Sequence, residues 1–159
     1  MSGAENSGAD SFVLLQVGRR RFALRADNVE ELAPPVKLHR FPHTSPLVVG
    51  VIVRRGRVVP VYDIAPVLLG RSSPAHRFYL VARREFGKTS EPSAIPVTGE
   101  CELAAGEVHP LEGDQPAYVE GAVTVAGETL DVLNLEKLVT SPATAPAASS
   151  DAAATEAQP

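Results

Sequence analysis

Few residues in this chain of 159 have the types and the spacing that enzyme chemistry requires. His39 and His43 lie four positions apart, the spacing of two metal ligands on one helix face. Pro42 between them forbids a helix, however, and no cluster of cysteines or carboxylates lies nearby. Cys101 is the single cysteine and lies between two glutamates, whose negative charge disfavours the reactive thiolate. These residues predict no metal site and no catalytic nucleophile.

Two further segments have features of a nucleotide-binding or catalytic site. Residues 82–89 end in Gly-Lys-Thr like a phosphate-binding loop, but the first glycine of that motif is missing, and three charged residues and a phenylalanine fill the loop. Asp63 follows an apolar segment, as catalytic acids often do, yet a helix N-cap explains it better because Asn134 holds the matching place in the second half. We therefore expect an exposed hairpin tip, a helix cap and no enzyme, with no catalytic residue and no cofactor.

Arginine-rich turns are the remaining candidates for ligand binding. Residues 19–21 and 54–57 each place three arginines at a predicted hairpin tip. Such tips can contact the phosphates of nucleic acid, but aromatic residues for base stacking make up only 5% of the chain, and an equally acidic half accompanies the basic one. A nucleic-acid-binding double β-barrel is therefore our second alternative. The leading expectation is that the arginines keep the turns solvated and that no nucleic acid binds.

The net charge of −4 conceals an uneven distribution along the chain. Residues 11–74 hold ten Lys and Arg against four Asp and Glu, whereas residues 75–140 hold five against eleven. The two halves therefore carry +6 and −6. Opposite charges of this size would steer the basic half of one molecule toward the acidic half of another, an attraction that salt would screen.

Short apolar segments separated by turn residues predict the elements that carry these side chains. The run Phe12–Val17 is typical of a buried strand, and residues 22–24 return as the second strand of a hairpin. Residues 48–53 and 58–62 flank the arginine-rich turn at 54–57, which predicts a second hairpin. Frequent turn signals and few long helical patterns predict an all-β fold with short helices.

The second half of the chain repeats the first at a constant offset of 71 residues without a gap. So many coincidences in one register predict two similar small β-units. Each unit has only about 65 residues, which is marginal for an independent core, so we expect the two units to share one. The matched pairs include Glu31 and Glu102, Leu32 and Leu103, Gly50 and Gly121, Gly56 and Gly127, and Asp63 and Asn134.

Both ends of the chain lack large apolar side chains that folding could bury. Residues 1–10 and the Ala/Pro/Ser-rich residues 141–159 are therefore predicted to be disordered, which leaves residues 11–140 to fold. The longest membrane-like run, Leu47–Val53, is far shorter than the about 20 residues of a transmembrane helix. The N-terminus has neither the basic start nor the apolar stretch of a signal peptide. We expect a cytoplasmic protein with no direct insertion into a membrane.

The first half carries a series of motifs in the order of a known family. Residues 29–32 read Val-Glu-Glu-Leu, a loop proline follows, and residues 50–64 fit the pattern Gly-Val-x-Asn-Leu-Arg-Gly-x-x-x-Pro-Val-x-Asp-(Ile/Leu). Val53 stands at the Asn position of this pattern and Arg54 at its Leu position. On these residues the segment 12–69 resembles the CheW-like domain of bacterial chemosensory systems.

The resemblance implies a particular fold. It would consist of two intertwined, five-stranded, SH3-like β-barrels with short helices, in one CheW-like domain at 11–140. The first barrel would span about 22–74 and the second about 75–139, with strands partly exchanged. Residues 121–138 resemble the last hairpin and helix of such a domain.

The resemblance also implies a function, that of a non-enzymatic adaptor in a bacterial chemotaxis or motility array. Such an adaptor couples the cytoplasmic tip of methyl-accepting chemoreceptors to the regulatory domain of a CheA-type histidine kinase, in cytoplasmic receptor clusters. Receptor contact would involve Val29, Glu31, Leu32 and Arg55, beside the groove between the barrels. The residues that would bind the kinase or other CheW-like proteins stay unassigned. The first alternative is a divergent accessory scaffold that binds receptors or other scaffolds but not the kinase.

Overall fold

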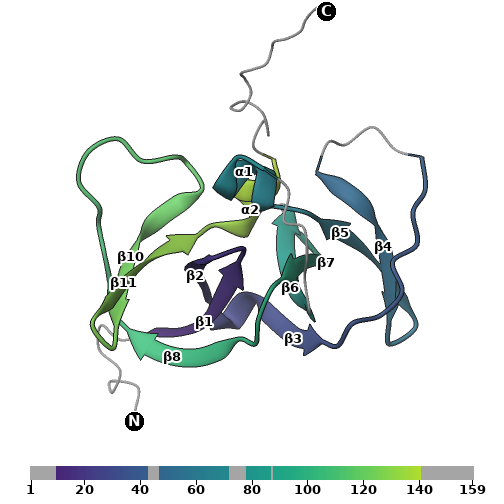
Figure 1. The fold of residues 1–159 in the computed structure, drawn as a ribbon, viewed down its shortest axis with the longest axis horizontal. Helices are drawn as coiled ribbons and strands as arrows, with labels where there is room; N and C mark the ends of the chain where they lie inside the picture. The colour runs from purple at the N-terminus through teal and green to yellow at the C-terminus, as the bar shows by residue number, and fades with distance from the viewer. Residues whose placement is uncertain (1–9, 43–46, 72–77, 87, 141–159) are drawn as a thin grey trace, which may run out of the picture.

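The computed structural model describes residues 10–42, 47–71, 78–86 and 88–140. Over these residues the chain forms two curled β-sheets side by side, with two short helices at their junction (Figure 1). The predicted all-β fold with short helices is therefore confirmed. The predicted disordered ends, 1–10 and 141–159, lie outside the described residues except for Asp10, which belongs to the first strand.

The first sheet, which we call the terminal barrel, is built from the two ends of the folded chain. Its strands are ordered β8-β1-β2-β11-β10-β9. Only Glu107 separates β8 from β9, so these two form one bent strand that pairs with β1 at one end and with β10 at the other, and this closes a five-stranded barrel. The strands are β1 (Asp10–Val17), β2 (Arg20–Arg25), β8 (Glu102–Gly106), β9 (Val108–His109), β10 (Val119–Val125) and β11 (Glu128–Leu133).

The second sheet, which we call the central barrel, is built from the middle of the chain. Its strands are ordered β3-β6-β7-β5-β4. The chain that leaves β3 closes the barrel at His39, whose backbone N–H and carbonyl bond to Val51 of β4 at 2.8 and 2.9 Å. The strands are β3 (Val29–Ala33), β4 (Val48–Arg54), β5 (Arg57–Tyr62), β6 (Phe78–Phe86) and β7 (Thr89–Val97).

The prediction placed the barrels at about 22–74 and 75–139 with strands partly exchanged, and the strand pairing identifies two hairpins that are exchanged. The β6–β7 hairpin, predicted in the second barrel, pairs with β3 and β5 of the central barrel. The β1–β2 hairpin, which contains the predicted start at residue 22, pairs with β8 and β11 of the terminal barrel. Each repeat thus gives its first hairpin to the other barrel. A repeat in sequence therefore does not mark a contiguous barrel in space.

The offset of 71 residues matches two equivalent closing contacts. A Cβ atom at Gly50 would lie 2.6 Å from the carbonyl oxygen of His39, and one at Gly121 would lie 2.8 Å from that of His109. In both barrels this glycine follows a bulge, in the β4–β5 hairpin or the β10–β11 hairpin, and lets the closing strand approach. The two glycines are matched because each barrel closes at that point.

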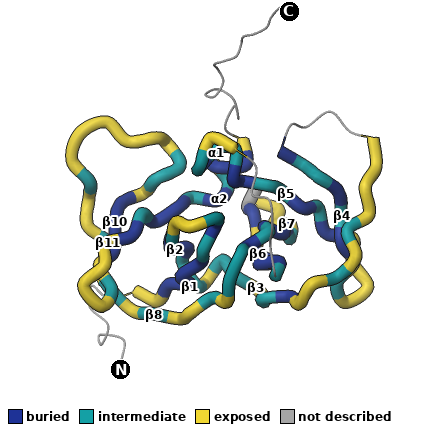
Figure 2. The backbone as a smooth tube through the Cα atoms, viewed as in Figure 1, coloured by how far each residue is buried: buried dark blue, intermediate teal, exposed yellow. Residues whose placement is uncertain are grey.

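Burial explains the continuous apolar run at the start of the chain, because β1 has both faces covered. Phe12 and Leu14 point into the terminal barrel, whereas Val13 and Leu15 face a core shared by the two barrels. The expected shared core is thus present, and Figure 2 shows buried stretches on the strands and helices that meet between the barrels. Large members of this core are Leu15, Phe22, Leu24, Ile64, Leu80, Ile95, Leu135 and Leu138.

Two short helices, α1 (Ala65–Leu69) and α2 (Leu135–Val139), cover the junction of the barrels. The predicted cap at Asn134 is confirmed, because its side chain accepts a hydrogen bond from the Lys137 N–H at 2.9 Å. Asp63 lies one residue before the N-cap of α1, which is Ile64, and accepts a hydrogen bond from the Ala65 N–H at 3.1 Å. A third element, the 3-10 turn η2 (Ala26–Asn28), links the terminal barrel to the central one. Among the described residues, no helix has the length and apolar character to span a membrane.

Candidate functional site

The four predicted receptor-contact residues lie on β3 and on the turn between β4 and β5 of the central barrel. Glu31 and Arg55 come together, with Nε of Arg55 3.5 Å from Oε2 of Glu31. Val29 and Leu32 are half-buried and pack against the core shared by the barrels. The structure therefore brings an ion pair and two apolar side chains to one strand and its neighbouring turn.

Arg54 is a member of this cluster that the sequence analysis left out of the site. Its Nη2 donates to Oε1 of Glu31 at 2.8 Å and its Nε donates to Oε2 at 3.2 Å. Both oxygens of the carboxylate are thus held by one guanidinium group, the two-point geometry that arginine favours with carboxylates. The signal was present in the sequence, because Arg54 stands where the CheW-like pattern has a leucine. A charge at an apolar position of the pattern marked this residue, but it did not identify the carboxylate with which Arg54 pairs.

A tight turn sets the directions of these arginines. Arg55 and Gly56 have φ of 54° and 76°, as in the two-residue loops that suit twisted hairpins. Arg54 and Arg57 are therefore paired across the hairpin, and Arg57 reaches back to Glu30 of β3 at 2.9 Å. Arg55 occupies the tip itself, in a left-handed conformation that costs a non-glycine residue about 1 kcal/mol.

The side chains of this cluster differ in exposure, because Glu31 and Arg54 are partly buried and Arg55 is exposed. The side chains of Glu31 and Arg54 are 14% and 22% exposed, whereas that of Arg55 is 71% exposed. Hydrogen bonds from Arg54 are the main reason that the pKa of Glu31 lies below its usual value, although partial burial opposes them. Glu31 is therefore ionised at neutral pH, and one positive charge of the cluster remains unmatched at the Arg55 tip.

Of the other arginine-rich segment, residues 19–21, Arg20 and Arg21 lie on β2 rather than at the predicted tip and bind groups of the chain itself. Arg21 pairs with Glu102 and with Glu128, and Arg25 pairs with Asp10 and Glu120 at 3.1 Å each. Arg20 stacks over the Phe22 ring, with Cζ 4.8 Å from the ring centroid, and its Nη1 donates to the Leu68 carbonyl of α1 at 3.2 Å. Cations so engaged are poorly placed to hold a phosphate backbone.

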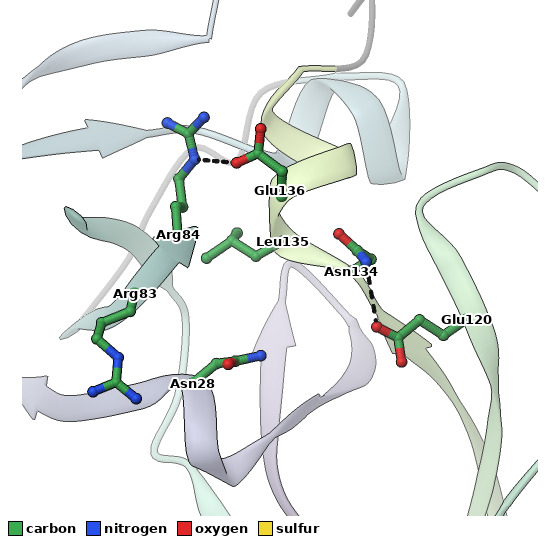
Figure 3. Close-up of a pocket in the computed structure, with 7 residues that line it drawn as sticks. All are labelled: Asn28, Arg83, Arg84, Glu120, Asn134, Leu135 and Glu136. Atoms are coloured by element: carbon green, nitrogen blue, oxygen red, sulfur yellow. Dashed lines mark hydrogen bonds and ion pairs between the residues drawn. The ribbon is translucent and has the colours of Figure 1, made fainter. Parts of the chain in front are cut away.

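A polar cavity of about 170 Å³ lies where the two barrels meet (Figure 3). Arg84 of β6 is buried at its edge, donates to Glu136 at 3.1 Å and to the Tyr62 hydroxyl at 2.6 Å, and so ties α2 to the central barrel. On the other side, Asn134 donates to Glu120 at 3.4 Å. The lining contains no nucleophile. It consists of Asn28, Arg83, Arg84, Glu120, Asn134, Leu135 and Glu136.

The other sequence candidates take structural places. His39 closes the central barrel through its backbone, and His43 lies outside the described residues. Lys88 lies between the strands β6 and β7 and Thr89 begins β7, so neither belongs to a strand-to-helix loop of the kind that binds phosphate. Burial raises the pKa of the Cys101 thiol to about 11, which keeps it protonated at neutral pH. Over the part of the chain that the structure describes, no three His, Cys, Asp or Glu residues group as metal ligands.

Known proteins match this chain in family and in fold. Residues 11–143 match the family model described as the CheW-like domain. A search of curated proteins finds no significant match. Among solved structures, the scaffolding protein TtCheW from Thermoanaerobacter tengcongensis superimposes with a TM-score of 0.71 at 16% identity, covering 91% of this chain and 96% of that one. At this identity the structural similarity shows a shared fold alone.

Proposed function

The chain belongs to the CheW-like domain family, and from that premise we propose that it couples methyl-accepting chemoreceptors to a CheA-type histidine kinase. It would act as a scaffold in a chemotaxis or motility array, without catalytic activity of its own. Its place would be the cytoplasm, at clusters of receptors. Other CheW-like proteins are candidate neighbours in the same array.

The observation that supports this proposal is the combination of the exposed Arg55 with the half-buried Val29 and Leu32. A chemoreceptor tip is a helical hairpin, whose surface presents apolar stripes with charged residues beside them. The half-buried apolar side chains of β3 and the exposed arginine of the neighbouring turn suit such a surface. We therefore propose Val29, Glu31, Leu32 and Arg55 as the receptor-binding residues.

Kinase binding is the part of the proposal that rests on the family alone. The terminal barrel carries Thr124 and Thr129, joined by a 3.0 Å hydrogen bond, where the central barrel exposes Val53 and Val58. Because the two outer faces differ in polarity, they suit different partners. The alternative is an accessory scaffold that binds receptors or other scaffolds but not the kinase.

Binding measurements with purified components separate the two functions. The full chain would be titrated by calorimetry with a soluble receptor-tip fragment and, separately, with the regulatory domain of a CheA-type kinase. The coupling function predicts binding to both, and the accessory function predicts binding to the receptor alone. Absence of binding to the receptor tip would contradict both.

A further inference from the structure

We propose that Arg54 sets the charge selectivity of the proposed receptor site by holding Glu31, so that Arg55 remains free to bind a carboxylate on the partner. The inference rests on the proposed function and deepens it. Arg54 acts here as a positioning residue, because it works through Glu31 and Arg55 and need not touch the partner.

The hydrogen-bond geometry ranks the two arginines as partners of Glu31. Arg54 donates to both carboxylate oxygens, at 2.8 and 3.2 Å, whereas Arg55 approaches one of them at 3.5 Å. A carboxylate whose two oxygens already accept charge-assisted bonds gains little from a third cation at longer range. Arg55 is therefore the weakly held member of the cluster.

Removal of Arg54 would change which arginine pairs with the Glu31 carboxylate. Arg57 is engaged by Glu30 at 2.9 Å, which leaves Arg55 as the cation in contact with Glu31 among the described residues. With a leucine at position 54, Glu31 would draw Arg55 inward from the turn tip. The surface would then lose its unmatched positive charge, and an acidic partner would gain less from binding.

The terminal barrel shows the same turn without this arrangement. Val125 and Ala126 stand at the places of Arg54 and Arg55, with Ala126 at φ of 53°. There Glu102 and Glu128 share a single cation, Arg21. The backbone of the turn therefore does not by itself supply an unmatched positive charge. The residue at position 54, or at the matching position 125, determines which cation pairs with the neighbouring glutamate.

The first test needs no partner. The pKa of Glu31 would be measured by carboxyl-carbon NMR titration in the natural protein, in Arg54→Leu, in Arg54→Lys and in the control Arg57→Leu, which removes one positive charge from the same turn. We expect Arg54→Leu to raise the Glu31 pKa, Arg54→Lys to raise it less, and Arg57→Leu to leave it nearly unchanged. An unchanged Glu31 pKa in Arg54→Leu would overturn the proposal.

The second test uses a soluble helical hairpin from the cytoplasmic tip of a methyl-accepting chemoreceptor. We expect Arg54→Leu to weaken its binding roughly fivefold, and the double variant Arg54→Leu/Glu31→Gln to restore it, because a neutral residue 31 no longer draws on Arg55. Arg57→Leu should change the affinity less than twofold, as a rim charge does. Thermal unfolding of each variant would verify that it is folded.

The outcomes distinguish the two proposals. A double variant that binds no better than Arg54→Leu would show that Arg54 contacts the partner or acts structurally, and would overturn the positioning role. Unaltered binding by Arg54→Leu would do the same. If the natural protein does not bind the receptor tip, the proposed function fails and the selectivity with it, while the Glu31 pKa still reports whether Arg54 holds that carboxylate.

Discussion

The β4–β5 hairpin of the central barrel and the β10–β11 hairpin of the terminal barrel have turns of the same backbone shape and different side-chain chemistry. The turns at Arg55-Gly56 and Ala126-Gly127 have nearly the same pair of positive φ angles. The central turn carries three arginines that meet glutamates of β3, whereas the terminal turn carries one glutamate that meets Arg21 from another hairpin. The repeat therefore preserves what closes a barrel and leaves the charge of the turn free to vary, which makes the central turn the candidate for a partner.

The exchange of hairpins changes the charge of each barrel. Residues 26–98, which include the central barrel, hold ten Lys and Arg against six Asp and Glu, and residues 10–25 with 99–140 hold five against ten. The barrels thus carry +4 and −5, compared with +6 and −6 for the two halves of the sequence. The basic β1–β2 hairpin partly neutralises the acidic barrel that it enters. Steering of scaffold contacts by these charges stays a prediction.

The two closing glycines give the largest expected effect. Gly50→Ala should lower the free energy of unfolding by about 2–3 kcal/mol, because its φ of 154° disfavours a side chain and its Cβ would meet the His39 carbonyl. Gly56→Ala is the control, since a Cβ there meets nothing within 4 Å, and should cost about 1 kcal/mol. Chemical denaturation measures both, and equal costs would show that the closing contact does not matter.

A charge change at the turn tip tests which barrel binds the receptor. Arg55→Ala should weaken binding of the receptor tip roughly tenfold, because the exposed cation is lost. Its melting temperature should hardly change. The reciprocal variant Ala126→Arg should add no binding. Calorimetry measures the affinities, and an Arg55→Ala protein that unfolds would show instead that Arg55 is structural.

The shared core offers a smaller test of the difference between the hairpins. Ala94 of β7 pairs in parallel with Val61, as Ala23 of β2 does with Val132, so Ser93 takes the place that Phe22 holds in the other hairpin. The Ser93 hydroxyl is buried without a hydrogen-bond partner. Ser93→Ala should therefore stabilise the protein by up to about 1 kcal/mol. A loss of stability in denaturant melts would show that the hydroxyl is satisfied.

The smallest expected effect is the loss of folding stability at low pH that comes from the Glu31–Arg54 pair. Because Arg54 lowers the pKa of Glu31 in the folded state, this pair contributes stability above the pKa of the unfolded chain, and the contribution is lost as pH falls through the folded pKa. The drop in stability between neutral pH and pH 3 should therefore be smaller in Arg54→Leu than in the natural protein. Denaturant melts at both pH values measure the difference, and an equal drop would contradict the role of the pair.

The sequence predicted those parts of the fold that local patterns determine. Apolar runs and turn residues located the hairpin at 54–57. They placed the first hairpin tip at 19–21, whereas the turn is at residues 18–19 and Arg20 already begins β2. The repeat matched Gly50 with Gly121, and Asn134 was recognised as a cap. The partners of each hairpin could not be found in this way. Which barrel receives β1–β2 depends on contacts between residues about 80 to 100 positions apart, as between Val13 and Leu103.

The candidate site was predicted in part for a related reason. The motif gave Glu31 and Arg55, which the structure brings together. It did not give Arg54, because whether a side chain at the end of β4 turns inward to β3 depends on the register between strands and not on the spacing in the sequence. The four contact residues stay a prediction until a partner is measured.

Mapping the receptor tip onto the two barrels by NMR tests the account most directly. Backbone amide shifts of the full chain would be followed while a soluble receptor-tip fragment is added. We predict that perturbed residues cluster on β3 and the Arg54–Arg57 turn of the central barrel, while the matching β8 and the Val125–Glu128 turn stay unchanged. Perturbation centred on the terminal barrel, or none in either barrel, would contradict the account.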